Sequence, residues 1–67
     1  MVEFGEQLRK AREAKGMTQQ SLAEQLYVTR QSVSRWECGL SAPSTTNLMA
    51  LAKLFNMTPE DLLKEVQ

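Results

Sequence analysis

The stretch that decides the fold, residues 17–39, reads MTQQSLAEQLYVTRQSVSRWECG. It contains two segments with helical apolar spacing, joined only by Tyr27 and Val28. Thr18 is a natural N-cap for the first segment and Thr29 for the second. So short a connection between helices of about nine residues forces them to cross steeply. The first of these helices is predicted to bury Leu22, Ala23 and Leu26.

The second of these helices has two unlike faces. At about 100° per residue, five of its residues, 30, 31, 34, 35 and 38, fall within one arc of about 140°, with Ser32 at the edge. Val33, Trp36 and Glu37 lie on the opposite side, where Trp36 is expected to anchor the helix in the core. The helix therefore combines a buried seam with a broad face of long, multi-donor side chains, which comprises Arg30, Gln31, Ser34, Arg35 and Cys38.

Outside this stretch the apolar spacing remains helical, and turn residues separate three further helices. Gly16 can end the first helix in a left-handed conformation, and Asn56 can do the same for a helix that Ser44 opens. Thr58 and Pro59 start a fifth helix, which is expected to run to the end of the chain. The predicted inward residues are Phe4, Leu8 and Ala11 in the first helix, Leu48, Leu51, Ala52 and Phe55 in the fourth, and Leu62, Leu63 and Val66 in the fifth.

The composition excludes several classes of function. The 67 residues form one domain, 1–67, and include no histidine and a single cysteine, Cys38. The usual general base, a zinc site and an internal disulfide are therefore ruled out, so an enzyme is not expected and no cofactor or metal is implied. The apolar runs are too short to span a bilayer, and no small-molecule ligand is evident. A free thiol favours a cytoplasmic location.

The net charge is zero, which at first argues against a nucleic-acid partner. The charges are unevenly distributed, however. Residues 1–53 hold seven Lys or Arg and five Asp or Glu, whereas residues 54–67 hold one lysine and three acids. Most of the chain is therefore mildly basic, and the C-terminal end is acidic.

The chain resembles the Cro/CI-type helix-turn-helix (XRE-like) family of DNA-binding repressors from about Phe4 to Leu63. The shared features are TQ opening the second helix, LA at its centre, SRWE-x-G closing the third helix, and the later P-S, LA and LL positions. The resemblance implies an all-α, compact five-helix fold of the lambda-repressor type, with the motif at about 18–38. Helix three would enter the DNA major groove while helix two crosses the backbone. Tyr27 departs from the family's usual glycine, so it is either strained or its turn is remodelled.

The resemblance also assigns residues to double-stranded DNA. Arg30 and Gln31 match base-reading positions, and their side chains can pair bidentately with guanine and adenine. Ser34 and Arg35 lie one turn further along, where Arg35 could read a base or grip a phosphate. The alternative is that this face is merely solvated. Positions expected to contact phosphate are Gln19 and, more weakly, Ser32, Ser44 and Thr45.

Two further assignments follow from the resemblance. Arg12 and Glu37 match a partly buried ion pair that ties helix one to helix three, although they could also be two unrelated surface charges. Cys38 ends the exposed arc; a redox role is conceivable, but there is no second cysteine in the chain to resolve it.

The sequence thus favours a transcriptional repressor that binds a palindromic operator as a homodimer. The alternative is a protein-interaction module of the same fold, such as an antitoxin or anti-repressor, and the chain could also be the N-terminal domain of a longer regulator. The expected dimer surface comprises Leu40, Met49, Leu54, Leu63 and Val66. For Leu54 and Leu63, the alternative to a place in this surface is burial within one monomer.

Overall fold

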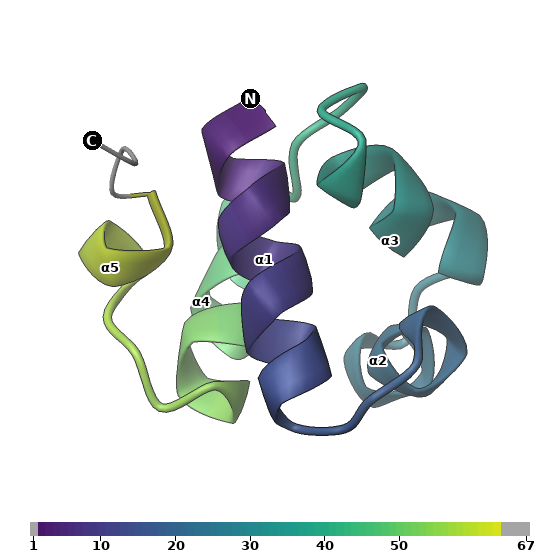
Figure 1. Ribbon diagram of the computed structural model, residues 1–67, viewed down its shortest axis with the longest axis horizontal. Helices are drawn as coiled ribbons and strands as arrows, with labels where there is room; N and C mark the ends of the chain where they lie inside the picture. Colours follow the sequence, from purple (N-terminus) through teal and green to yellow (C-terminus); the bar gives the residue numbers. More distant parts are fainter. Residues whose placement is uncertain (1, 64–67) are drawn as a thin grey trace.

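The computed structural model describes residues 2–63, and every regular element in this range is a helix. The five predicted helices are present (Figure 1). The fifth was expected to run to the chain end; it is described as far as Leu63, and residues 64–67, where the rest of that expectation falls, lie outside the described range. The helices are α1 (Val2–Ala14), α2 (Gln19–Leu26), α3 (Arg30–Glu37), α4 (Thr45–Leu54) and α5 (Pro59–Leu63).

The predicted N-caps set where the helices begin. The Thr18 hydroxyl accepts the Ser21 backbone N–H at 3.0 Å, and the Ser21 hydroxyl accepts the Thr18 N–H at 2.9 Å. This reciprocal pair satisfies two donors that the first turn of α2 would otherwise leave unpaired. Thr29 caps α3 and Ser44 caps α4 through equivalent bonds of 3.1 and 3.2 Å.

Left-handed residues end the helices as predicted. Gly16 has φ 69° and Gly39 has φ 76°, conformations that glycine adopts without steric cost. Asn56, which tolerates this region, has φ 56°. Tyr27 has φ 58° and ψ 39°, so the α2–α3 turn keeps its left-handed geometry and is not remodelled around the tyrosine.

The core lies where α1 packs against α3 and α5 while α2 packs against α3 and α4. In Figure 1, α1 crosses the middle of the molecule, with α3 and α2 on one side and α4 and α5 on the other. Leu48 and Ala11, both predicted to face inward, lie half-buried at the edge of the core. The buried apolar residues are Phe4, Leu8, Leu22, Ala23, Leu26, Val33, Trp36, Leu51, Ala52, Phe55 and Leu62.

Gly5 lets α1 and the end of α3 approach closely. It is buried on the inner side of α1. A Cβ atom at this position would lie 2.8 Å from the Trp36 carbonyl oxygen and closer still to that of Glu37. Because both neighbours are backbone atoms, no side-chain rotation could relieve the overlap. The glycine therefore fixes how deeply the C-terminal end of α3 sits on α1.

None of the helices within residues 2–63 has the length and apolar character that crossing a membrane requires.

Candidate nucleic-acid interface

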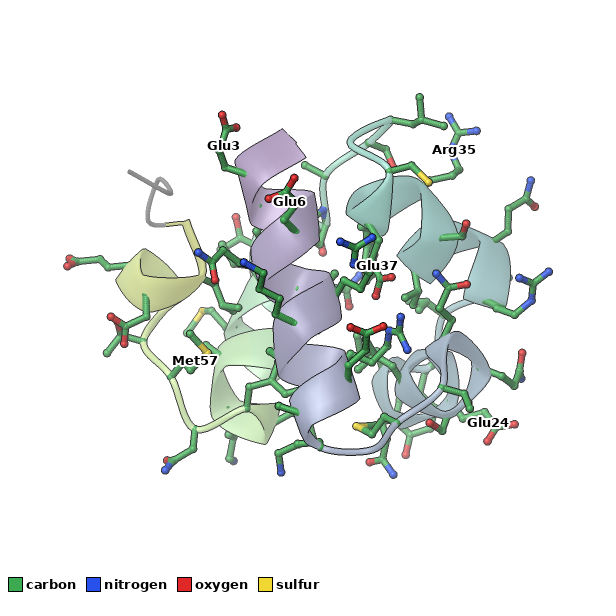
Figure 2. The ribbon with its side chains drawn as sticks, viewed as in Figure 1. Glu3, Glu6, Glu24, Arg35, Glu37 and Met57 are labelled. Atoms are coloured by element: carbon green, nitrogen blue, oxygen red, sulfur yellow. The ribbon has the colours of Figure 1, made fainter. Side chains whose placement is uncertain are left out.

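The outward face of α3 is built as the sequence predicted. Val33 is 0% exposed and Trp36 is 5% exposed, so these two side chains hold the helix to the core. Arg30, Gln31 and Arg35 are exposed, and Ser34 between them is half-buried. In Figure 2 the labelled Arg35 extends from α3 away from the body of the molecule. Two guanidinium groups and one amide therefore stand along a single exposed helix face.

The residues expected to contact phosphate differ in how free their side chains are. The Ser32 hydroxyl lies 3.0 Å from the Thr29 hydroxyl, within the cap of α3. Ser44 accepts the Asn47 N–H and is exposed, and Thr45 is exposed at the first position of α4. Both therefore lie where a helix N-terminus favours an anion.

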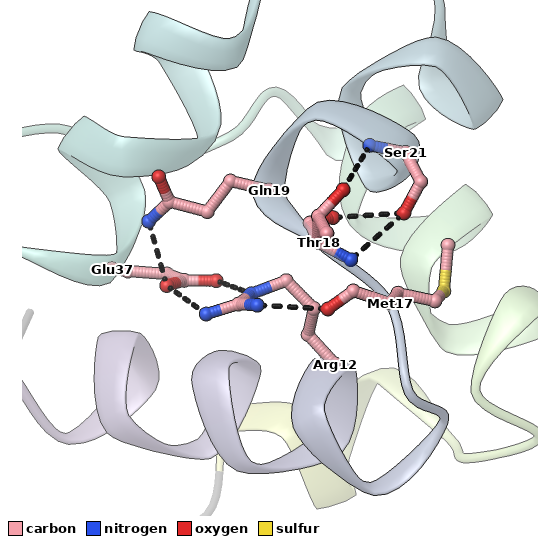
Figure 3. Close-up of polar contacts among 6 residues, drawn as sticks. All are labelled: Arg12, Met17, Thr18, Gln19, Ser21 and Glu37. Atoms are coloured by element: carbon pink, nitrogen blue, oxygen red, sulfur yellow. Dashed lines mark hydrogen bonds and ion pairs between the residues drawn. The ribbon is translucent and has the colours of Figure 1, made fainter.

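Gln19, Glu37 and Arg12 come together from three helices (Figure 3). Arg12 Nε donates to Glu37 Oε2 at 2.7 Å, and Arg12 Nη2 donates to Glu37 Oε1 at 3.2 Å. Gln19 Nε2 donates to the same Oε1 at 3.1 Å. Arg12 Nη1 also donates to the Met17 carbonyl oxygen at 2.9 Å. Arg12 and Glu37 are thus an ion pair and not two unrelated surface charges.

This ion pair is largely shielded from solvent. The side chains of Arg12 and Glu37 are 11% and 4% exposed. The hydrogen bond to Glu37 raises the pKa of Arg12 above its ordinary value, against the lowering effect of burial, and the charges of Glu37 and Glu13 add to the rise. Because the folded-state pKa of Arg12 is higher than the unfolded one, the resulting stability is complete below the ordinary arginine pKa and is lost only as the pH rises through the folded-state pKa. Arg12 therefore stays charged at physiological pH.

The residues expected at a dimer surface separate into three groups. Leu40 and Met49 are 67% and 60% exposed. Leu54, for which burial within one monomer was the alternative, is half-buried against the core and lines an open groove with Gln25 and Leu26 of α2. The packing of α4 on α2 is the reason. Nothing is described of the Leu63 side chain, and Val66 lies outside the described residues.

Two features of this site were not predicted from the sequence. Gly5 was not singled out, although its place on the inner side of α1 with Leu8 and Arg12 is typical of a close helix contact. The bond from Gln19 to Glu37 was also missed, because a polar residue in the first turn of a helix gives no signal of a partner 18 residues away. Cys38 is a free, exposed thiol at the C-cap of α3.

Residues 8–62 match the family model described as helix-turn-helix. The HTH-type transcriptional activator BcrR of Enterococcus faecalis is 44% identical over 62 residues, which are 92% of this chain and 30% of that protein. The HTH-type transcriptional regulator DicA of Escherichia coli (strain K12) is 42% identical over 60 residues, 90% of this chain and 44% of that protein. The chain therefore spans less than half the length of these two relatives.

Two solved structures are similar over nearly the whole chain. One is the P22 c2 repressor in complex with the synthetic operator 9T, with a TM-score of 0.88 and 31% identity over 96% of this chain and 97% of that one. The other is the restriction-modification controller protein C.AhdI from Aeromonas hydrophila, with a TM-score of 0.82 and 36% identity over 91% and 92% of the two chains.

Proposed function

We propose, because this chain belongs to the Cro/CI-type (XRE-like) helix-turn-helix family, that it binds double-stranded DNA sequence-specifically and regulates transcription. One structural observation carries the proposal: α3 buries Val33 and Trp36 while Arg30, Gln31 and Arg35 stand exposed on its other side. Arginine and glutamine side chains are donors suited to base edges and phosphates. A face that is only solvated does not require three long hydrogen-bond donors on the same side of the helix.

In this proposal α3 lies in the major groove and α2 crosses the DNA backbone. Arg30 and Gln31, at the N-terminal end of α3, read base edges. Ser34 and Arg35 follow one turn later on the same face, with Arg35 contacting a base or a phosphate. The P22 c2 repressor, which has the same fold, was solved on an operator, and this supports the docking geometry.

The phosphate contacts are proposed for residues at helix starts. Gln19 begins α2, and Ser44 with Thr45 begins α4. Each position combines a polar side chain with backbone N–H groups that the helix cannot satisfy. Ser32 is the weakest candidate of the set, since its hydroxyl is already engaged with Thr29.

We further propose a homodimer on a palindromic operator, acting as a repressor. A single module of this size buries only about 600–1,000 Å² on DNA, too little for tight binding without basic arms. Two copies related by a two-fold axis would read half-sites about one helical turn apart. Repression needs nothing beyond occupancy of a promoter, which a domain of this size can provide.

Selection of binding sites from random duplex DNA tests the proposal. We expect one sequence to be enriched, with two inverted half-sites, and we expect its affinity to fall as salt rises. Lys10→Ala is the matched control, because it removes a positive charge from the exposed side of α1 opposite the inner face that packs on α3. It should leave the selected sequence unchanged. Failure to enrich any sequence would contradict the proposal, and reporter expression from a promoter carrying the site separates repression from activation.

A further inference from the structure

Glu37 shares its carboxylate between two helices in addition to its own. Oε2 accepts Arg12 of α1, whereas Oε1 accepts both Arg12 and the side-chain amide of Gln19, the first residue of α2. The Glu37 side chain is 4% exposed, while Gln19 as a whole is half-buried. The amide of Gln19 is therefore bonded to a carboxylate that is shielded from solvent, while Gln19 itself is partly open to solvent.

The chemistry of the carboxylate fixes which way this amide faces. A carboxylate paired with a guanidinium only accepts hydrogen bonds, so Gln19 must turn its NH₂ group toward Glu37 and not its carbonyl oxygen. One N–H is used in that bond at 3.1 Å. The other N–H of the same planar group then points in a direction that the bond to Glu37 determines.

We propose that Glu37 is a positioning residue that orients the Gln19 amide so that its second N–H meets a DNA phosphate. This inference rests on the proposed function, because it concerns the phosphate contact assigned to Gln19. An unrestrained glutamine at a helix start would sample several rotamers, and ordering it on DNA would lower the affinity. In this structure the bond to Glu37 already orders the Gln19 side chain in the absence of DNA.

Arg12 makes this arrangement compatible with a phosphate nearby. A lone carboxylate behind Gln19 would repel the incoming phosphate charge. Arg12 is bound to both oxygens of Glu37, so the pair presents little net charge to the DNA. Arg12 thereby allows Glu37 to act on Gln19 without opposing binding.

A double-mutant cycle in DNA affinity tests the proposal. Gln19→Ala should lower the affinity of the wild-type chain for its selected duplex about fivefold, the usual effect of losing one hydrogen bond. In a Glu37→Gln background the same change should lower the affinity less than about twofold. The single carbonyl oxygen of glutamine at 37 would be taken by Arg12, leaving an NH₂ group facing Gln19 that cannot hold the amide in its present direction.

Gln20→Ala is the matched control. Gln20 lies in the same first turn of α2 but is exposed, and its amide donates to Glu24 at 3.1 Å. Its effect on affinity should be small and equal in the two backgrounds. A purely structural role for Glu37 would lower affinity by the same factor whatever stands at position 19, so equal costs of Gln19→Ala in both backgrounds would overturn the proposal.

The wild-type chain offers a second measurement in case Glu37→Gln does not fold. Side-chain ¹⁵N relaxation should give the Gln19 amide an order parameter near that of rigid backbone, about 0.8, whereas exposed Gln31 should fall below about 0.6. Equal mobility of the two amides would overturn the inference even if DNA binding is found. If the wild-type chain bound no duplex, the proposed function would fall and the inference with it, so the two failures are distinguishable.

Discussion

Tyr27 holds a left-handed backbone conformation while its side chain packs against almost nothing. Its φ is 58° and it is 96% exposed. A non-glycine residue loses about 1–2 kcal/mol in this region, and glycine loses about 0.5–1 kcal/mol in backbone entropy. Tyr27→Gly should therefore raise the free energy of unfolding by about 0–1 kcal/mol. Urea unfolding followed by Trp36 fluorescence measures it. Tyr27→Ala, which keeps the strained backbone, should change little, and a loss well above 1 kcal/mol in the glycine variant would show that the ring packs usefully.

Arg30 and Gln19 are expected to fail in different ways when removed. Arg30→Ala should weaken binding to the selected duplex by about 1–3 kcal/mol and relax the preference at one base pair, because arginine reads guanine bidentately. Gln31→Ala should do the same at a neighbouring base pair. Gln19→Ala should weaken all duplexes alike, since phosphates carry no sequence. Binding of each variant to a panel of single-base-pair substitutions measures this, and an Arg30→Ala variant with unchanged base preference would show that α3 docks differently.

Gly5 sets the distance between two helices, α1 and α3, so a substitution there affects the packing of both. Alanine normally stabilises a helix interior by about 1 kcal/mol relative to glycine. Here the added Cβ meets the Trp36 and Glu37 carbonyl groups, and α3 would have to move off α1. Gly5→Ala should therefore lower the free energy of unfolding by about 1–3 kcal/mol, as overpacked cores do. Thermal unfolding checks the sign. An exposed position in the same helix, Glu6→Ala, is the control and should stay within about 0.5 kcal/mol.

The positions and inward faces of the helices could be predicted from the sequence. Helix starts could be predicted because a hydroxyl side chain can accept a backbone N–H of the first turn. Each predicted N-cap does so in the structure: Thr18, Thr29, Ser44 and Thr58. The inward stripes follow because helical spacing is fixed by geometry. The exposed arc of α3 could be found for the same reason. Contacts between helices far apart in sequence, such as the bond from Gln19 to Glu37, depend on interhelical distance and rotation, which no local pattern encodes.

A dimer is a property of the whole molecule and of its concentration. Of the residues expected at the interface, Leu40 and Met49 are exposed in the part of the chain that the structure describes. We expect binding to a full palindrome to depend on the second power of protein concentration, and binding to one half-site on the first. Leu40→Gln should weaken binding to the palindrome and leave binding to the half-site unchanged. Ala14→Gln, at an exposed position of α1, should leave both affinities unchanged. Sedimentation with the two duplexes measures this, and equal affinity for palindrome and half-site would argue for a monomer.

The contacts of Glu37 with α1 and α2 also affect the rates at which the domain folds and unfolds. Arg12 and Glu37 are 25 residues apart in sequence, so their bond can form only once α1 and α3 lie against each other. Helical chains of this size reach their transition state through local contacts, within microseconds to milliseconds. An interaction absent from that state leaves the folding rate unchanged and slows unfolding. The ion pair would then lengthen the lifetime of the folded domain, and with it the time for which α3 keeps its outward face intact.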